Sequence, residues 1–334
     1  MKTHRVLLSL AFFSLFLCLP LLPLEIKLGS LAPGGSPWDT ALRRVAAEWL
    51  SESKGQITIK VYSGGIAGDE ADMIRKMRIN QLQAAAITGL GLNQIALDVL
   101  TIQLPFLVRT DEELDYTLEK MGPDYNQMIE AKGFKVLLWS SAGWAKFFSK
   151  DPIIYPEDLK PQRLFVMEGH ADIDQAWKEL GYRVIPINPN NALTALQSGM
   201  VDAFTATPLL AAAMQWFALA PHMCDLNFAP LIGGLIINAS TWKRIPADLQ
   251  PRLMSSLHRV EKQMRQETIE LEGKAIEVMV KNGLQIHRLT PQAVRAWEDF
   301  VFGNFDLVAG KAFSMEVYEK TKAYVEEYRR SNAR

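Results

Sequence analysis

Residues 163–206 read RLFVMEGHADIDQAWKELGYRVIPINPNNALTALQSGMVDAFTA. Three short apolar runs, RLFVMEG, YRVIPI and MVDAFTA, alternate in this stretch with two amphipathic stretches of helical length, DIDQAWKELG and NPNNALTALQSG. Strands that alternate with helices in this way pair in parallel, because each helix carries the chain back across the sheet. The stretch therefore predicts an α/β fold.

The same alternation occupies the chain before this stretch. Predicted strands lie at 25–31, 56–62, 82–88 and 134–150. Ser36 followed by Pro37 is typical of a helix start, and the helix it opens runs to about residue 53. The last of these strands is rich in aromatic residues and leads out of the first group. The chain thus contains two separate α/β groups.

A proline-punctuated linker, PIIYPEDLKPQ at 152–162, separates the two groups. The apolar run APLIGGLIINASTW at 229–242 predicts a strand that returns to the first group, and residues 246–282 predict one long helix that bridges both. We expect the following organisation: a signal peptide or N-terminal anchor at 1–24, domain I at 25–148 and 237–275, domain II at 149–236, and a C-terminal helical segment at 276–334 packed on both domains.

The N-terminus carries an export signal. Lys2, His4 and Arg5 precede an apolar run at 6–24, which is the layout of a signal peptide. The run nearly spans a bilayer, so an uncleaved membrane anchor stays open as an alternative. The lipid-anchor alternative at Cys18 is disfavoured because bulky Leu17 precedes it. We expect a periplasmic protein, either free or anchored.

Composition and motifs argue against an enzyme. The chain has 36 basic and 37 acidic side chains, so it has no overall field that would collect nucleic acid. Nucleophile elbow, zinc-protease, phosphate-loop and paired-cysteine motifs are absent, and TGLGLNQ at 88–94 lacks the third glycine of a dinucleotide fingerprint. HMCD at 222–225 is a poor metal site without another ligand. We expect a binding protein with no cofactor and no metal.

Five blocks resemble one family when taken in order. They are YSGGIAGDEADMIRKMRINQLQAAAIT at 62–88, LPFL at 104–107, PEDLK at 156–160, ALQSGMVDA at 195–203 and IPADLQ at 245–250. Together they resemble the substrate-binding subunit of tripartite ATP-independent periplasmic (TRAP) transporters, of the dicarboxylate-receptor (DctP-like) type. The likeness runs from about Glu25 to about Val301. It implies a periplasmic-binding-protein-like fold of two domains, joined by crossing hinge strands and spanned by a long helix.

The resemblance also implies partners. A small-molecule ligand lies between the domains of such receptors, and a small and a large membrane subunit accept it. An accessory periplasmic protein is a further expected partner. The chain departs from the family pattern where members carry charged ligand anchors: Phe165 takes the place of the arginine that binds a carboxylate, Ala145 that of a second arginine, and Phe204 to Ala206 replace an amide and an acid. It resembles a divergent subgroup.

These departures predict an apolar pocket for a hydrophobic or amphipathic ligand. The predicted ligand-binding residues are Phe165, Met167, Phe204, Thr205, Thr207, Trp144, Phe147, Trp139, Trp216 and Gly89. The main competing hypothesis is a carboxylate or sugar-acid receptor that uses a non-standard basic residue, namely Arg163, Lys146 or Arg183. An enzyme that uses Asp202 with His170 and an assembly protein without an enclosed cavity also stay open as hypotheses.

Overall fold

Strands and helices alternate along most of the chain, as the sequence predicts. The structure, a computed structural model, describes residues 23–168 and 171–332. The strands are β1 (Leu24–Ser30), β2 (Ile57–Tyr62), β3 (Ala84–Thr88), β4 (Phe134–Ser149), β5 (Arg163–Met167), β6 (Arg183–Ile187), β7 (Ala203–Ala206), β8 (His222–Asp225), β9 (Ala229–Asn238) and β10 (Gln285–Arg288). The α-helices are α1 (Pro37–Glu52), α2 (Glu70–Arg78), α3 (Gly89–Ile95), α4 (Asp111–Glu130), α5 (Pro156–Leu159), α6 (Ala171–Glu179), α7 (Ala192–Gln197), α8 (Pro208–Ala213), α9 (Ala239–Lys243), α10 (Gln250–Lys281), α11 (Pro291–Gly303) and α12 (Met315–Asn332). The 3-10 helices are η1 (Leu97–Gln103), η2 (Pro189–Asn191), η3 (Trp216–Ala218) and η4 (Phe305–Leu307).

The strands form two sheets that share β4. The order is β2-β1-β3-β9-β4-β7-β5-β6, with β8 paired to both β4 and β10. We call the part built on β1, β2 and β3 the first lobe, and the part built on β5, β6 and β7 the second lobe. Within each lobe these strands are parallel, whereas β4 and β9 run antiparallel to their neighbours. Each lobe therefore has the parallel sheet that its sequence pattern predicts.

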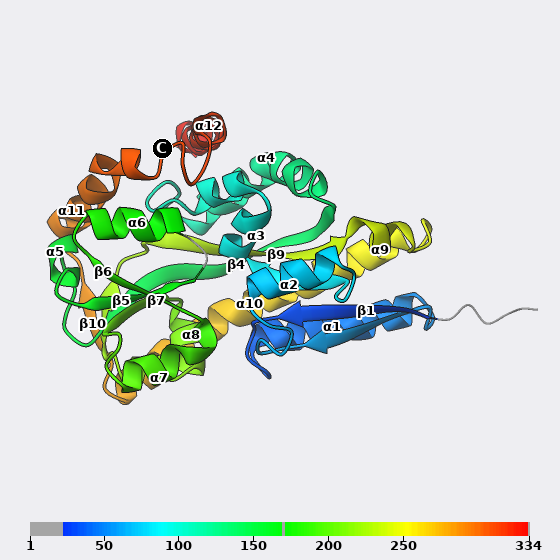
Figure 1. Cartoon of the computed structure of the whole chain (residues 1–334), viewed down its shortest axis with the longest axis horizontal. Coiled ribbons are helices and arrows are strands. Elements are labelled where there is room, and N and C mark those ends of the chain that lie inside the picture. Colours follow the sequence, from blue (N-terminus) through cyan, green and yellow to red (C-terminus); the bar gives the residue numbers. More distant parts are fainter. Residues whose placement is uncertain (1–22, 169–170, 333–334) are drawn as a thin grey trace, which may run out of the picture.

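Three elements connect the lobes. β4 pairs with β9 over most of its length and then continues into the second sheet, where it pairs with β7. The 32-residue helix α10 packs against α1 in the first lobe and against α8 in the second. Figure 1 shows these elements passing from one lobe to the other. The predicted crossing strands and long bridging helix are thus both present.

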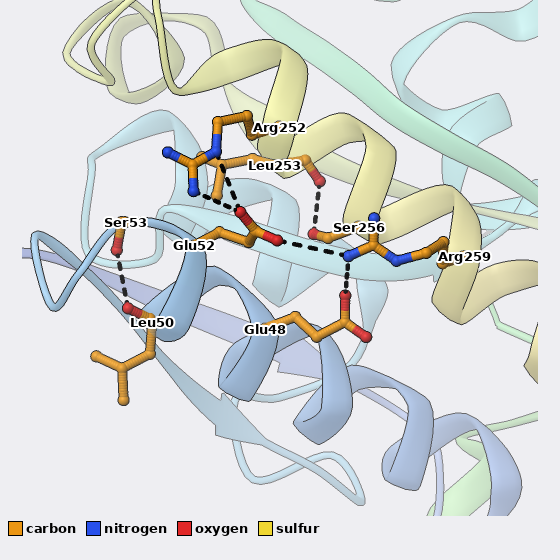
Figure 2. Close-up of polar contacts among 8 residues, drawn as sticks. All are labelled: Glu48, Leu50, Glu52, Ser53, Arg252, Leu253, Ser256 and Arg259. Atoms are coloured by element: carbon orange, nitrogen blue, oxygen red, sulfur yellow. Dashed lines mark hydrogen bonds and ion pairs between the residues drawn. The ribbon is translucent and has the colours of Figure 1, made fainter.

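The contact between α1 and α10 has a buried centre and a charged rim. Trp49 is only 1% exposed, and its indole N–H donates to the carbonyl oxygen of Leu253 at 3.2 Å. At the rim, Arg259 forms an ion pair with Glu48 at 3.0 Å and another with Glu52 at 3.6 Å (Figure 2). Burial of a large aromatic ring contributes far more free energy than exposed ion pairs do. Trp49 is therefore the main anchor of α10 on the first lobe.

The C-terminal segment packs on both lobes. Trp297 of α11 is fully buried and stacks on Phe147 of β4, with ring centroids 5.1 Å apart, whereas α12 packs against α4. The predicted boundary at 275/276 falls inside α10, and Leu24, which we placed in the signal segment, is the first residue of β1. The division of the chain into the four predicted segments stays a prediction. Most of the expected signal lies outside the described residues.

Two local features of the second lobe decide how its chain is directed. The apolar stretch PLLAAAMQWFAL covers residues 208–219, but α8 ends at Ala213, and Gln215 adopts a left-handed backbone conformation with φ of 56°. This turn redirects the chain so that Trp216 packs edge-on against Phe165. HMCD at 222–225 forms β8, which pairs with β10 from the C-terminal segment.

No helix within residues 23–168 and 171–332 combines the length and the apolar character needed to cross a bilayer.

Replacement of Trp49 by alanine tests the anchor on α10. We expect Trp49→Ala to lower the free energy of unfolding by about 3–5 kcal/mol, because it leaves a large cavity. The control Arg259→Ala removes an arginine whose side chain is 58% exposed, and it should cost no more than about 1 kcal/mol. Urea unfolding at neutral pH measures both values. Equal losses in the two variants would show that the charged rim, and not the buried ring, holds the helix.

Candidate functional site

A cavity of about 570 Å³ lies between the lobes. Its wall includes residues at the carboxyl ends of parallel strands in both lobes: Ser30 is the last residue of β1, Thr88 of β3 and Met167 of β5, and Thr205 lies in β7. Ligands bind at this edge in open α/β sheets, because the loops and helix starts that follow the strands converge there. The cavity is also within the size range of small-molecule sites. It is therefore the candidate ligand site.

The wall of the cavity is mainly apolar. Large aliphatic and aromatic side chains come from both lobes, among them Leu42 and Trp38 from α1 and Trp177 and Trp216 from the second lobe. Residues 229–235 of β9 form part of the wall from the connection between the lobes. Burial of an apolar molecule against such a wall is favourable by roughly 25 cal/mol per Å² removed from water.

The ionisable side chains in the described part of the wall are all carboxyls: Glu70, Asp174 and Glu261. Glu70 accepts hydrogen bonds from the backbone N–H of Thr88 at 2.5 Å and from its hydroxyl at 2.9 Å. Burial raises the pKa of all three carboxyls, which favours their neutral forms. Among the described residues, the wall contains no lysine, arginine or histidine.

The basic residues considered for a carboxylate ligand lie elsewhere. Arg163 donates to Asp202 from Nε at 2.6 Å and from Nη2 at 2.8 Å, and this bidentate pair holds the pKa of the Asp202 carboxyl below its usual range. Lys146 donates to Asp225 at 2.8 Å, and Arg183 is exposed. Each of these side chains is thus paired or solvated outside the cavity wall. His170, considered with Asp202 for an enzyme, lies outside the described residues.

Five of the ten predicted ligand-binding residues line the cavity. They are Phe165, Met167, Thr205, Thr207 and Trp216. Phe165 and Met167 alternate with Val166 on β5 near the carboxyl edge of the sheet. The side-chain oxygen of Thr207 accepts a hydrogen bond from the N–H of Leu210 and caps α8. The strand ends and the cap therefore bring residues that are 40 positions apart in sequence into one wall.

The structure places Phe204 and Phe147 in the core instead of the cavity wall. Both are fully buried. Phe204 stacks on Phe148 with centroids 5.1 Å apart, and Phe147 packs between Phe228 and Trp297 at 4.8 Å and 5.1 Å. Phe204 shares a sheet face with Phe165, its register partner on β5, but packing on Phe148 and Trp216 buries it completely. For these two residues the expected wall position is corrected.

The three remaining predicted residues also lie outside this wall. The indole N–H of Trp144 donates to Asp111 at 3.0 Å, and that of Trp139 donates to Asn126 at 2.9 Å. Trp139 lines a second pocket, between β4, α4 and α10. Gly89 is buried at the start of α3. These indoles are therefore directed to partners in the first lobe by their own hydrogen bonds.

Gln103 is a wall residue that the sequence pattern did not predict. Its side-chain oxygen accepts from the N–H of Ile232 at 3.3 Å. A Cβ atom at Gly89 would lie 2.1 Å from Nε2 of Gln103, so a larger residue at position 89 would displace this side chain. One signal was available: Gln103 is the only polar side chain between Ile102 and Val108, directly before the LPFL block.

Glu70 gives the site a testable dependence on pH. Its pKa is raised in the folded protein from a usual value of 4.5, so the folded state holds the proton more tightly than the unfolded state does. Its contribution to stability is therefore complete below the unfolded pKa and declines as the pH rises toward the folded pKa. Glu70→Gln does not titrate. We expect its stability relative to the parent to be greater at about pH 8 than at about pH 4 in urea unfolding. A difference that does not change with pH would contradict a buried titrating carboxyl.

Comparisons with known proteins agree with this architecture. The family model described as DctP, bacterial extracellular solute-binding protein, family 7, matches residues 28–302. The 2,3-diketo-L-gulonate-binding periplasmic protein YiaO of Escherichia coli (strain K12) is 24% identical over 269 residues, which cover 77% of this chain and 80% of that protein.

Solved structures show the same fold. A TRAP periplasmic solute binding protein from Desulfovibrio salexigens, with bound orotic acid, has a TM-score of 0.84 at 20% identity and covers 92% of this chain and 99% of its own. One from Xanthobacter autotrophicus Py2, with bound β-D-galacturonate, has a TM-score of 0.80 at 21% identity and covers 89% of this chain and 99% of its own. The two-domain fold and the expectation of a binding protein rather than an enzyme are confirmed. The chain belongs to the DctP family of bacterial extracellular solute-binding proteins, family 7.

Proposed function

We propose that this solute receptor binds a hydrophobic or amphipathic small molecule in the cavity between its lobes and delivers it to the small and large membrane subunits of a TRAP transporter. One observation carries the ligand class: the described wall of the cavity is mainly apolar and contains no basic side chain. A carboxylate placed there would lose its hydration without gaining a cation, at a cost of several kcal/mol. An apolar molecule has no such cost.

The competing proposal is a receptor for a carboxylate or sugar acid. It is favoured by the relatives, since the solved neighbours hold orotic acid and β-D-galacturonate. The positions of the basic side chains argue against it, because Arg163 and Lys146 are already paired with Asp202 and Asp225. Export by the N-terminal segment, its cleavage or retention as an anchor, and an accessory periplasmic partner stay predictions.

Phe165 offers a direct test of the apolar site. Its ring is 5% exposed, lines the cavity and lies edge-on to Trp216, with centroids 6.0 Å apart. We expect Phe165→Arg to weaken binding of the neutral fluorescent probe N-phenyl-1-naphthylamine by about 100-fold or more, since an unpaired buried charge costs several kcal/mol and each ~1.4 kcal/mol is tenfold. Fluorescence titration measures the affinity.

Phe165→Leu is the matched control, because it keeps the site apolar and should cost much less. Thermal melts of both empty variants separate lost binding from lost folding. Binding of the probe by Phe165→Arg at the parent's affinity would remove Phe165 from the site.

The carboxylate alternative has its own test. Titration calorimetry with succinate and with galacturonate should give no measurable heat for the parent protein. Arg163→Gln should leave the affinity for the naphthylamine probe within about twofold, because Arg163 lies outside the cavity wall. A twofold change is small, since each ~1.4 kcal/mol of binding free energy changes the affinity tenfold. Tight succinate binding that Arg163→Gln abolishes would establish the alternative instead.

A further inference from the structure

The loops that follow the two outermost strands meet at the rim of the cavity. In the strand order, β2 and β6 stand at opposite ends, and the crossing strands β4 and β9 lie between them. Gly65 follows β2 in the first lobe, and Asn190 follows β6 in the second. The side-chain amide of Asn190 fills the space beside Gly65, because a Cβ atom at Gly65 would lie 2.7 Å from its Nδ2 and 3.4 Å from its Oδ1. The lobes therefore also meet away from the strands that connect them.

This contact borders the cavity. Pro189, the chain neighbour of Asn190, lines the wall from the second lobe. The backbone N–H of Gly65 donates to the carbonyl oxygen of Ser30 at 3.0 Å, and Ser30 lines the wall from the first lobe. The contact thus lies directly outside the wall. A molecule that enters or leaves between the two loops must separate Gly65 from Asn190.

Each side of the contact is held by its own lobe. In the first lobe, the Ser63 hydroxyl donates to the carboxylate of Asp39, which is buried in α1. In the second lobe, Oδ1 of Asn188 accepts from the backbone N–H of Asn190 at 3.1 Å and caps η2. These hydrogen bonds tie each loop to its own lobe. The two loops therefore move with the lobes.

We propose that Gly65 and Asn190 form the closing contact of the receptor: the lobes separate there to admit the ligand, and the two loops meet to retain it. This inference rests on the proposed receptor function and adds the place at which the cavity opens. Position 65 suits glycine for two reasons. Its φ of 76° favours glycine, and the amide of Asn190 leaves no room for a side chain in the closed form.

Gly64 separates these two reasons. Its φ of 65° is also positive, but no described residue other than its chain neighbours comes within 4 Å of its Cβ position. Glutamine at 64 and glutamine at 65 therefore impose similar backbone strain, and only the latter lies against Asn190.

We expect Gly65→Gln to weaken binding of N-phenyl-1-naphthylamine about tenfold and to speed its dissociation, because the apparent affinity falls with the fraction of molecules that can close. The control Gly64→Gln should bind the probe within about twofold of the parent. Fluorescence titration and stopped-flow dilution measure affinity and dissociation. Thermal melts of the empty variants compare their folding.

A second substitution tests whether Asn190 is the obstacle. Asn190→Ala removes the three atoms nearest to the Cβ position of Gly65. In the Gly65→Gln background it should restore the affinity to within about threefold of the parent, because the effects of residues in contact are not additive.

Cross-linking tests the contact without a ligand. A disulfide forms only between Cα atoms about 4.4–6.8 Å apart. We expect the double variant Gly65→Cys, Asn190→Cys to form this disulfide with oxidised glutathione, as identified by peptide mapping. When the probe is bound before oxidation, the oxidised form should release it at least about tenfold more slowly than the reduced form, because the lobes cannot open.

The outcomes separate this inference from the function on which it rests. Failure of the parent protein to bind the probe overturns the apolar receptor, and cross-linking of the empty protein still decides whether the two loops meet. Absence of the disulfide, or equal effects of Gly65→Gln and Gly64→Gln on probe binding, overturns the closing contact while the receptor function stands. A disulfide that leaves release of the probe unchanged shows that the cavity opens elsewhere and also overturns it.

Discussion

The continuous pairing of β4 with β9 is the constraint on which the rest of the structure depends. Phe134 to Ala145 of β4 pair with Asn238 to Ala229 of β9, and β4 then pairs with β7 and β8. β4 thus belongs to both sheets, so its backbone hydrogen bonds fix the position of each lobe relative to the other. The cavity lies against the paired strands β4 and β9, because Ser140 to Ala142 and residues 229–235 are part of its wall.

The paired strands β4 and β9 pack closely against the neighbouring backbone. A Cβ atom at Gly233 would lie 2.9 Å from the carbonyl oxygen of Ile87 on β3, a backbone atom that cannot move aside easily. The register of β4 shifts near Gly143, whose φ of 103° is accessible mainly to glycine. Gly233 lets β9 lie close to β3, and Gly143 lets β4 bend beside the cavity. The shape of the cavity therefore depends on backbone geometry as much as on its side chains.

Ion pairs outside the cavity explain why its described wall contains no basic side chain. The chain has nearly equal numbers of basic and acidic side chains, yet the described wall contains acidic side chains and no basic ones. Arg163 is held by Asp202 and Lys146 by Asp225, so both cations are compensated within the second lobe. The described part of the cavity is left with carboxyls whose neutral forms are favoured by burial.

The sequence by itself determined the α/β alternation, the two crossings and the long helix, because hydrophobic periodicity and helix-start residues are local signals. The resemblance to the family further predicts that Phe165 replaces a charged anchor, and this stays a prediction. Only the tertiary structure decided which aromatic residues reach the cavity: Trp216 does so after the left-handed turn at Gln215, whereas Phe204 stacks on Phe148 in the core. All of these residues are apolar, so the sequence alone does not separate wall residues from core residues. The direction of each side chain depends on strand register and on packing against segments distant in sequence. Gln103 was missed for the same reason, since its place in the wall depends on its packing over Gly89 and on its hydrogen bond with Ile232, a residue distant in sequence.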